Sequence, residues 1–275
     1  MSPQDTANAI MAGELSPSVA FGRPELYPHF ATKGGMSLLG SSTKIDLNEG
    51  MGYVTSVLYM MPAMSSGREA CGGRSKGCTF VCLVKKVGRM DMASPQRARR
   101  RKHAAFYADR ARFMSDLSAE ITAQERRAAK LGKVSAIRLN GTTDIPFERY
   151  PVGDAANIMD AHPDTIFYDY TKLALRHRTA RGPIPTNYSL TFSVSERADA
   201  EMRASEYLDA GYNAAIVFAT EKHNLPATYP LGGATRPVVD ADLHDARFLD
   251  PAGSIAGLYA KGLAKNDDSG FVRAL

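Results

Sequence analysis

The three cysteines of the chain could hold a metal ion, because all of them fall within one short, glycine-rich segment. Six residues separate Cys71 from Cys78, and three separate Cys78 from Cys82. Three thiolates at this spacing can converge on one centre and leave one coordination position open. On an iron–sulfur cluster the open iron could bind a cofactor or substrate, and on zinc the fourth ligand could be a histidine or an activated water. Their basic neighbours are expected to lower the thiol pKa values: Arg68, Arg74, Lys76, Lys85 and Lys86. The alternative is three unligated thiols packed under a loop.

Two aspartates, Asp144 and Asp169, close adjacent predicted strands and could act as a catalytic pair. Paired carboxylates serve as acid, base or nucleophile when their surroundings separate their pKa values. Lys172 follows Asp169 and is the third candidate catalytic residue. The alternative is a buried ion pair between Arg138 and Asp169, since both lie in apolar runs where an unpaired charge is costly. The predicted strand ends also supply candidate substrate-binding residues, namely Arg138, Asn140, Ser193 and Ser195.

Other polar groups are weaker candidates. Asp240, Asp242 and Asp245 resemble a hard-cation site, although their spacing fits no EF-hand. His223 and His244 have no obvious partners and are expected on the surface. We find no Walker A, G-x-G-x-x-G, H-E-x-x-H or G-x-S-x-G pattern, which weakens the nucleotide-hydrolase, Rossmann, zincin and α/β-hydrolase interpretations.

Positive charge is concentrated in one block. The chain carries a net charge of +5, but residues 68–133 hold 17 Lys and Arg against 6 Asp and Glu, so the rest has a net charge of −6. A basic block on an acidic body favours a polyanion partner, such as nucleic acid or a phosphorylated small molecule. The alternative is a solvated helix face. The candidate nucleic-acid contacts are Arg97, Arg99, Arg100, Arg101, Lys102 and Arg110.

The composition is that of a soluble globular protein. The 275 residues are 44% hydrophobic and 23% charged, which excludes a disordered, collagen-like or coiled-coil chain. No stretch reaches the ~18 apolar residues of a membrane span, and residues 1–14 lack the pattern of a secretory signal. These features predict a cytoplasmic protein that does not enter a membrane.

The elements that must position these groups can be read from periodicity. Residues 1–50 contain many glycines and prolines and predict an extended N-terminal arm. A capping serine and a proline predict the start of a basic helix over 95–131, long enough to contain a break. A capping box at Ser193 and Glu196 predicts a helix to about residue 210, and a shorter helix is expected over 154–161. Six strands are predicted over 53–59, 134–139, 165–170, 187–192, 213–219 and 254–260.

Strands that alternate with helices predict a parallel sheet with right-handed crossovers. Six such units over 51–275 predict an α/β fold, a partial or distorted (β/α) barrel of about six parallel strands, with a doubly wound open sheet as the alternative. The cysteine loop, 65–90, follows the first strand. Sites in either fold lie at the C-terminal ends of the strands. We therefore expect the cysteines and the polar strand ends to share one edge.

Several strings resemble a family of bacteriophage proteins grouped as gene product 88-like. The likeness covers the chain from about Lys44 to Val272, and it implies a viral or prophage origin and action inside a bacterial host cell. Besides the cysteine loop, the strings that carry it are RLNGTTDI (138–145), FYDYTK (167–172), NYSLTFS (187–193), RFLDP (247–251) and SGFV (269–272).

Two further likenesses are weaker. Cysteines after a first strand, followed by five more strands, are similar to radical S-adenosylmethionine barrels, which implies S-adenosylmethionine as a candidate cofactor. Those proteins use C-x3-C-x2-C, and this chain has C-x6-C-x3-C. A barrel with two strand-end aspartates resembles guanine transglycosylases, which implies Asp169 as nucleophile and Asp144 as base. Those enzymes hold zinc by cysteines near the C-terminus, and this chain has none there.

The sequence thus favours a phage enzyme that modifies nucleic acid or a nucleotide, with an iron–sulfur or zinc centre at the strand ends. The first alternative is DNA base exchange of the guanine transglycosylase type. The second is a DNA-binding or host-takeover protein without catalysis, in which the cysteines are structural.

Overall fold

The computed structural model describes residues 36–65, 67–85 and 88–275. The first 35 residues of the predicted arm lie outside these ranges. The rest of the arm is not extended, because it folds into the short elements β1 (Leu39–Gly40), α3 (Thr43–Asp46) and η2 (Leu47–Met51). Leu38 and Ile45 are buried there, so their apolar side chains hold the segment against the sheet.

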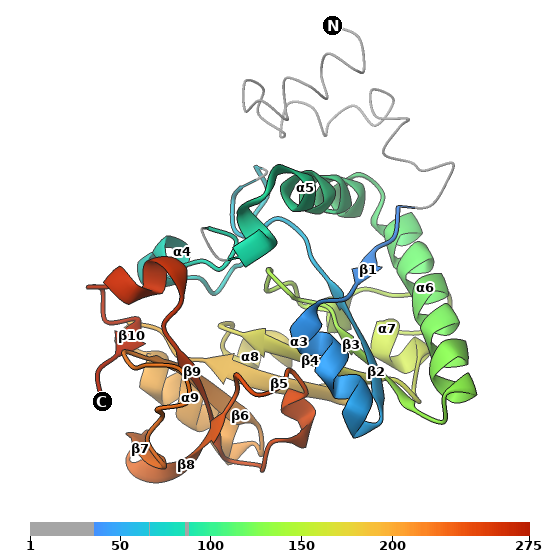
Figure 1. The fold of residues 1–275 in the computed structure, drawn as a ribbon. Coiled ribbons are helices and arrows are strands. Elements are labelled where there is room, and N and C mark those ends of the chain that lie inside the picture. Colours follow the sequence, from blue (N-terminus) through green and yellow to red (C-terminus); the bar gives the residue numbers. More distant parts are fainter. Residues whose placement is uncertain (1–35, 66, 86–87) are drawn as a thin grey trace, which may run out of the picture.

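A mostly parallel sheet forms the centre of the protein (Figure 1). Its six central strands correspond to the six predicted strands, and each is parallel to the next. In spatial order they are β2 (Tyr53–Leu58), β3 (Val134–Arg138), β4 (Ile166–Thr171), β5 (Tyr188–Ser193), β6 (Asn213–Phe218) and β9 (Ile255–Tyr259).

The sheet is open, so the predicted barrel is not confirmed. At one edge β1 pairs antiparallel with β2, and at the other β8 (Ala234–Asp240) lies parallel to β9 and carries the antiparallel β7 (Thr228–Leu231). The last strand, β10 (Val272–Arg273), pairs with the end of β6. Within the described ranges the two edges do not pair, and six strands are fewer than the eight that close a (β/α) barrel. The sequential order from β2 to β6 also differs from that of a doubly wound sheet.

Helices cover one face of the sheet, the helical face. The long α6 (Arg110–Lys130) packs on β2 and β3, and α9 (Ala200–Asp209) packs on β5 and β6. Two short helices, α7 (Ile158–Ala161) and α8 (Leu175–Arg178), lie in the crossovers between β3 and β5. The core of this face contains strand residues such as Ile137, Phe167 and Ile216.

Two predicted helices begin or break at different residues. The basic helix divides into α5 (Ala93–Ala108) and α6, because Asp109 adopts an extended conformation and its carboxylate accepts a hydrogen bond from Arg112 N (3.0 Å). The predicted capping box does not start a helix. Glu196 binds another segment, and α9 begins four residues later.

The opposite face, which we call the second face, carries alternate strand residues including Arg138, Tyr168 and Tyr170. The segment after β8, with the 3-10 helix η5 (Arg247–Leu249), packs on it. The Phe248 ring lies 4.8 Å from the Tyr53 ring and 5.3 Å from the Tyr168 ring. This aromatic cluster covers the part of the second face nearest the start of the strands.

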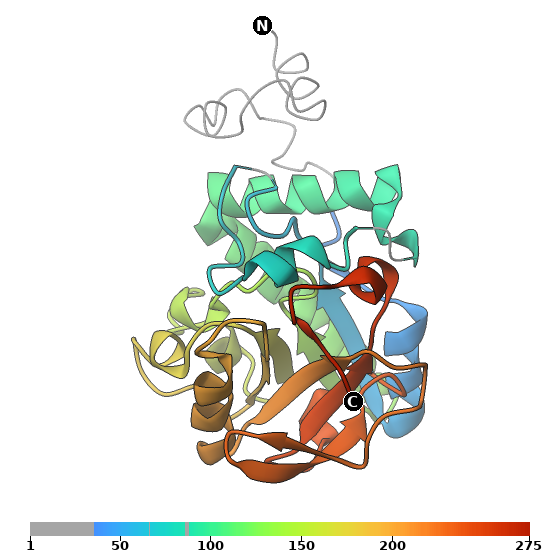
Figure 2. The same ribbon diagram turned by 90° about the vertical axis from the view of Figure 1, so that its left-hand side faces the viewer.

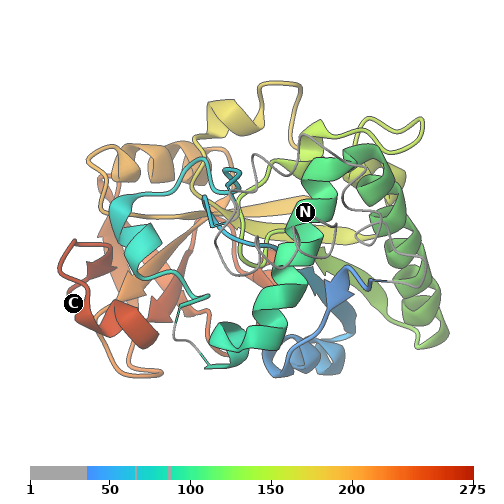
Figure 3. The ribbon, with the colours of Figure 1, turned by 90° about the horizontal axis from the view of Figure 1, so that it is seen from above.

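The cysteine loop lies over the C-terminal ends of the strands. Figures 1 and 2 show α4 (Lys76–Phe80) and α5 above this edge, and Figure 3 shows α5 running diagonally across it. The 3-10 helix η3 (Gly88–Asp91) leads into α5, and η6 (Gly262–Asn266) follows β9; η4 (Phe147–Arg149) lies between β3 and α7. None of the helices in the described part of the chain has the length and apolar character that a membrane crossing requires.

Candidate functional site

Cys71 lies beside the ends of β2 and β3. Its sulfur accepts a hydrogen bond from Ala63 N (3.3 Å), just beyond β2, and lies 3.9 Å from the carbonyl oxygen of Thr142, just beyond β3. The neighbouring Ala70 carbonyl accepts a hydrogen bond from Asp144 N (2.7 Å). The first cysteine is therefore fixed to the loop that contains the candidate residues Asn140 and Asp144.

The rest of the cysteine loop crosses the ends of β4, β5 and β9. A side chain at Gly73 would meet the backbone after β4, because its Cβ would lie 2.5 Å from the carbonyl oxygen of Lys172. Glu196, after β5, accepts hydrogen bonds from Gly77 N (2.8 Å) and Ser75 Oγ (2.7 Å) at the start of α4. Cys78 packs against a small apolar cluster formed by Val81, Ala260, Ala264 and Phe271. One segment thus contacts the ends of five parallel strands.

The cysteines are half-buried free thiols. Burial raises the pKa of the Cys71 thiol, and the charges of Cys78 and Cys82 would raise it further. Burial also raises the pKa of Cys82, although Lys85 and Arg99 act in the opposite direction. The prediction that basic neighbours lower these pKa values is therefore wrong for Cys71 and Cys82, because desolvation outweighs the nearby positive charge.

The donor chemistry of the three thiols suits zinc or an iron–sulfur cluster, since both prefer thiolate ligands. All three cysteines act on one another electrostatically, so they share one region. In the ranges that the structure describes, no group of three or more His, Cys, Asp or Glu side chains is arranged to hold a metal ion.

Asp144 is the centre of a buried ion-pair network. Its carboxylate accepts hydrogen bonds from Thr171 Oγ1 (2.8 Å), Lys172 N (2.8 Å) and Arg178 Nη2 (2.6 Å). Arg178 is fully buried and also pairs with Glu148 (3.0 Å). Asp144 therefore joins the end of β3 to the end of β4 and α8.

Asp169 lies on the helical face, like Phe167 two residues before it. Its carboxylate accepts hydrogen bonds from Asn140 N (2.7 Å), Asn140 Nδ2 (3.0 Å) and Tyr188 OH (2.8 Å). Burial raises its pKa to about 6, although Arg138 and these hydrogen bonds lower it. Both oxygens are used to hold the loop after β3, which is a structural task. Asn140 is thus committed to Asp169 and to the backbone of Ile145.

Arg138 does not form the expected ion pair with Asp169. Its side chain lies on the second face, where Nη1 donates to both oxygens of Asp245 (3.2 and 3.3 Å). Tyr168 OH donates to the same carboxylate (3.0 Å), and the guanidinium lies 4.8 Å from the centre of the Tyr170 ring. The predicted ion pair is wrong because the two side chains lie on opposite faces of the sheet. Arg138 lies on the same face as Tyr168 and Tyr170 of β4. Asp169 lies between these two tyrosines in the strand and therefore points to the other face.

Two of the remaining candidates meet at the strand ends. Lys172 Nζ donates to the hydroxyl (2.5 Å) and the carbonyl oxygen (3.1 Å) of Ser193, and it lies 4.8 Å from the centre of the Phe271 ring. Ser195 is buried, and its carbonyl oxygen accepts a hydrogen bond from Arg273 Nη2 (3.0 Å). Lys172 and Ser193 therefore form a polar pair at the ends of β4 and β5, and Ser195 is not part of that pair.

The candidate nucleic-acid contacts, five on α5 and Arg110 at the start of α6, divide into two sets. Arg97, Arg101 and Arg110 are exposed and Arg100 is half-buried. Arg99 and Lys102 instead point into the protein, with 3% and 8% of their surface exposed. Lys102 Nζ donates to the Leu38 carbonyl (2.6 Å) and so anchors the start of the described chain. The exposed set is the part that a nucleic acid could reach.

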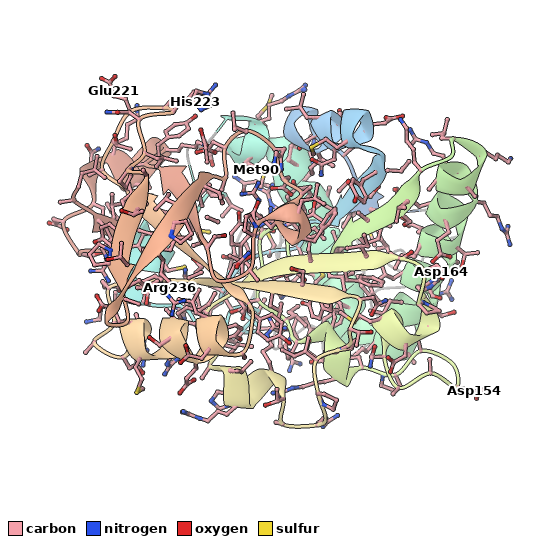
Figure 4. All side chains as sticks on the ribbon, turned by 90° about the horizontal axis from the view of Figure 1, so that it is seen from below. Met90, Asp154, Asp164, Glu221, His223 and Arg236 are labelled. Carbon is pink, nitrogen blue, oxygen red and sulfur yellow. The ribbon has the colours of Figure 1, made fainter. Side chains whose placement is uncertain are left out.

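The aspartates at the end of β8 and just beyond it do not form a shared cation site, because each has its own basic partner. Asp245 pairs with Arg138, Asp242 with Lys261, and Asp240 with His223 (2.5 Å). His223 therefore has a partner, contrary to the expectation from the sequence. It lies with Glu221 on the loop after β6 (Figure 4). His244 Nδ1 also lies 3.0 Å from Arg247 Nη2.

The sequence interpretation missed Arg178, Glu148 and Tyr188, which complete the networks around the two aspartates. Arg178 lies in a basic stretch whose sequence suggests exposure to solvent. Arg178 is buried whereas Arg176 is exposed, and the difference comes from partners that are distant in the sequence. Glu196 was noticed as a capping residue, but its contact with Gly77, over a hundred residues away, had no local signal.

Comparison with known proteins places the chain in one family. The comparison with curated proteins gave no match, and neither did the comparison with solved structures. The family described as gene product 88 matches residues 36–275, a range that contains every residue that the structure describes. The strings around Asn140, Asp169 and Ser193 that suggested this likeness lie at the C-terminal ends of β3, β4 and β5. The chain therefore belongs to the gene product 88 family.

Proposed function

We propose that this protein is a phage-encoded enzyme that modifies nucleic acid or a nucleotide, with a metal or iron–sulfur centre held by Cys71, Cys78 and Cys82. The observation that carries the proposal is the position of the cysteine loop, which contacts the ends of five parallel strands. Active sites of parallel α/β folds lie at this edge. A centre bound there would supply Lewis-acid or redox chemistry, with S-adenosylmethionine as a candidate cofactor.

The chain's own residues suit the reception of an anionic substrate at this edge. Lys172 places a positive charge next to the Ser193 hydroxyl. The helix α5 lies above the same edge (Figure 3). It carries the exposed Arg97 and Arg101, which could contact phosphates, each adding to a salt-dependent affinity. We therefore assign substrate contact to Lys172, Ser193 and the exposed face of α5.

The geometry gives less support to the base-exchange alternative. That reaction needs an accessible carboxylate nucleophile, and Asp169 is 2% exposed with both oxygens hydrogen-bonded. Asp144 is likewise saturated by three donors. We assign both aspartates to positioning rather than to chemistry.

A DNA-binding protein without catalysis is the second candidate. The exposed arginines of α5 favour it, since they would act in the same way with or without a metal centre. In that case the cysteines stabilise the loop as packed thiols, as the apolar contacts of Cys78 would allow.

The test is purification without oxygen, followed by elemental and sulfide analysis and an absorption spectrum. We expect bound zinc, or iron and sulfide with broad absorption near ~400 nm. Cys71→Ser, Cys78→Ser and Cys82→Ser should each lose the metal, whereas Ser65→Ala in the same loop should keep it. Metal-free wild-type protein that still binds DNA would reject the enzyme proposal in favour of the second candidate.

A further inference from the structure

A serine, a histidine and a glutamate are joined by hydrogen bonds where α6 meets the end of α7. His162 Nε2 lies 2.8 Å from Ser118 Oγ, and His162 Nδ1 lies 3.0 Å from Glu125 Oε1. Ser118 and Glu125 belong to α6, and His162 directly follows the last residue of α7. We call these three side chains the relay, because each contacts the next.

The carboxylate sets the direction of the hydrogen bonds in the relay. A carboxylate accepts hydrogen bonds and donates none, so the proton of the neutral imidazole lies on Nδ1, where it meets Glu125. This leaves Nε2 as an acceptor for the hydroxyl proton of Ser118. Thr165 Oγ1 also donates to Glu125 Oε1 (2.6 Å) and holds the carboxylate in place. The relay therefore has the order nucleophile, base and orienting carboxylate.

The base is fixed and the nucleophile is within reach of solvent. His162 is 5% exposed, and its carbonyl oxygen accepts hydrogen bonds from Thr165 N (3.1 Å) and Asn187 Nδ2 (3.1 Å). Ser118 is only half-buried. A small molecule could therefore approach the hydroxyl while the imidazole stays in its orientation.

A cavity of about 530 Å³ lies beside the relay, and both His162 and Glu125 line it. Alanines of α6 and α7 and the first residues of β3 form much of the remaining wall. Asp164, labelled in Figure 4, also lines the cavity, which lies at the edge of the sheet opposite to the cysteine loop. A volume of this size admits a small organic molecule, which would there contact the base of the relay.

We infer that the relay is a second catalytic site, in which Ser118 is the nucleophile that accepts the acyl group of a small carboxylic ester. Ser118 Oγ bonds to the acyl carbon while its proton passes to His162 Nε2, and His162 gives that proton to the departing alcohol. Water then attacks the acyl-serine with His162 again as base, and Ser118 regains a proton as the bond between the carbon and Oγ breaks. The net reaction converts an ester and water into an acid and an alcohol. This activity goes beyond the proposed function and does not involve the cysteines.

The alternative is that the relay only fastens α7 to α6. Both interpretations predict that replacement of the buried His162 lowers the free energy of unfolding. They differ in the chemistry of Ser118, because only an activated hydroxyl reacts covalently with an electrophile. The reactivity of this serine therefore separates a catalytic relay from a structural one.

The test is reaction of the full chain with a fluorophosphonate probe, which modifies activated serine hydroxyls, followed by mass spectrometry of the modified peptide. Hydrolysis of p-nitrophenyl acetate is measured in parallel. We expect one modified residue, Ser118, and neither modification nor hydrolysis in Ser118→Ala. Ser115→Ala, an exposed change on the same helix, is the matched control. Its rate of modification should stay within about twofold of the wild type.

Two further variants test the roles of the base and the carboxylate. His162→Gln should slow the modification by about 100-fold or more, because a general base contributes about 10²–10⁴-fold. Glu125→Gln should slow it by at least about tenfold, since a glutamine amide can donate to Nδ1 and so favours the wrong tautomer of the imidazole. Glu125→Gln changes a single atom type, so it tests the relay even if His162→Gln does not fold.

Three results would overturn the inference. The first is wild-type protein that the probe does not modify, and the second is modification at a residue other than Ser118. The third is an equal rate of modification in wild-type protein and Glu125→Gln, because the serine would then react without help from the relay.

Discussion

Gly73 offers a specific test of how the cysteine loop is held over the strand ends. Replacement by alanine would place a methyl carbon 2.5 Å from the carbonyl oxygen of Lys172 and 2.7 Å from Leu173 N. The neighbouring Gly72 provides a matched control, because its Cβ would lie 3.6 Å from Leu173 Cδ2, an ordinary contact. Neither glycine has a left-handed conformation, so the comparison isolates the close approach.

The expected magnitude follows from the nature of the obstacle. The atoms in the way at Gly73 belong to backbone, which cannot rotate aside as a side chain can. Overpacking of a tight contact costs about 1–3 kcal/mol. We expect Gly73→Ala to lose about this much free energy of unfolding, or to release the loop from the end of β4. Gly72→Ala should change the free energy of unfolding by less than about 0.5 kcal/mol.

The assay is urea unfolding of both variants and the wild type, with metal content measured in parallel. Gly73→Ala should show a lower midpoint or a lower metal content, and Gly72→Ala should resemble the wild type. Equal stability and equal metal content in the two variants would refute the close packing of this loop on β4.

Three other changes test the buried networks and the basic helix. Arg178→Met leaves Asp144 and Glu148 buried without their cation and should lower the free energy of unfolding by about 3–5 kcal/mol. The control Arg176→Met, at an exposed position, should leave this free energy nearly unchanged in the same urea titration. Equal losses of stability in the two variants would contradict the ion-pair network. The pKa of Asp169 is raised to about 6 by burial, so the folded state binds a proton more tightly than the unfolded state, and this stabilisation is complete at low pH and lost as pH rises through 6. The free energy of unfolding of wild-type protein should therefore fall relative to Asp169→Asn by up to about 3 kcal/mol between pH 4 and 7; parallel pH curves would show that the carboxyl is not perturbed. Arg97→Gln with Arg101→Gln should weaken DNA binding and reduce its salt dependence by up to about two counterions, whereas Lys222→Gln on a distant exposed loop should do neither, and an unchanged salt slope would remove α5 from the interface.

The sequence predicts the strands well because each is a short apolar run bounded by turn residues. The strand from Asn213 to Phe218 is an example, since it is apolar almost throughout and lies in the middle of a parallel sheet. Closure of the sheet depends on strand number and on contacts between distant edges, which local periodicity does not encode. The elements α3 and η2 are too short to show a period, so that part of the arm was expected to be extended.

The candidate site is predictable only in its location. Cysteines after the first parallel strand indicate the C-terminal edge, where Cys71 indeed meets the loop after β3. The roles of Arg138 and Asp169 depend on which face each side chain takes, and both faces of β4 are buried, so alternation gives no clue. The inward orientation of Arg99 within a run of basic residues likewise depends on what packs beneath the helix.

We propose that three thiolates from one loop bind a single centre at the C-terminal edge of the parallel sheet. X-ray absorption spectroscopy at the zinc and iron edges of anaerobically purified wild-type protein tests this proposal. We predict a shell of sulfur ligands at ~2.3 Å that is lost in Cys71→Ser. A metal-free sample, or a shell of nitrogen and oxygen ligands alone, would contradict the claim.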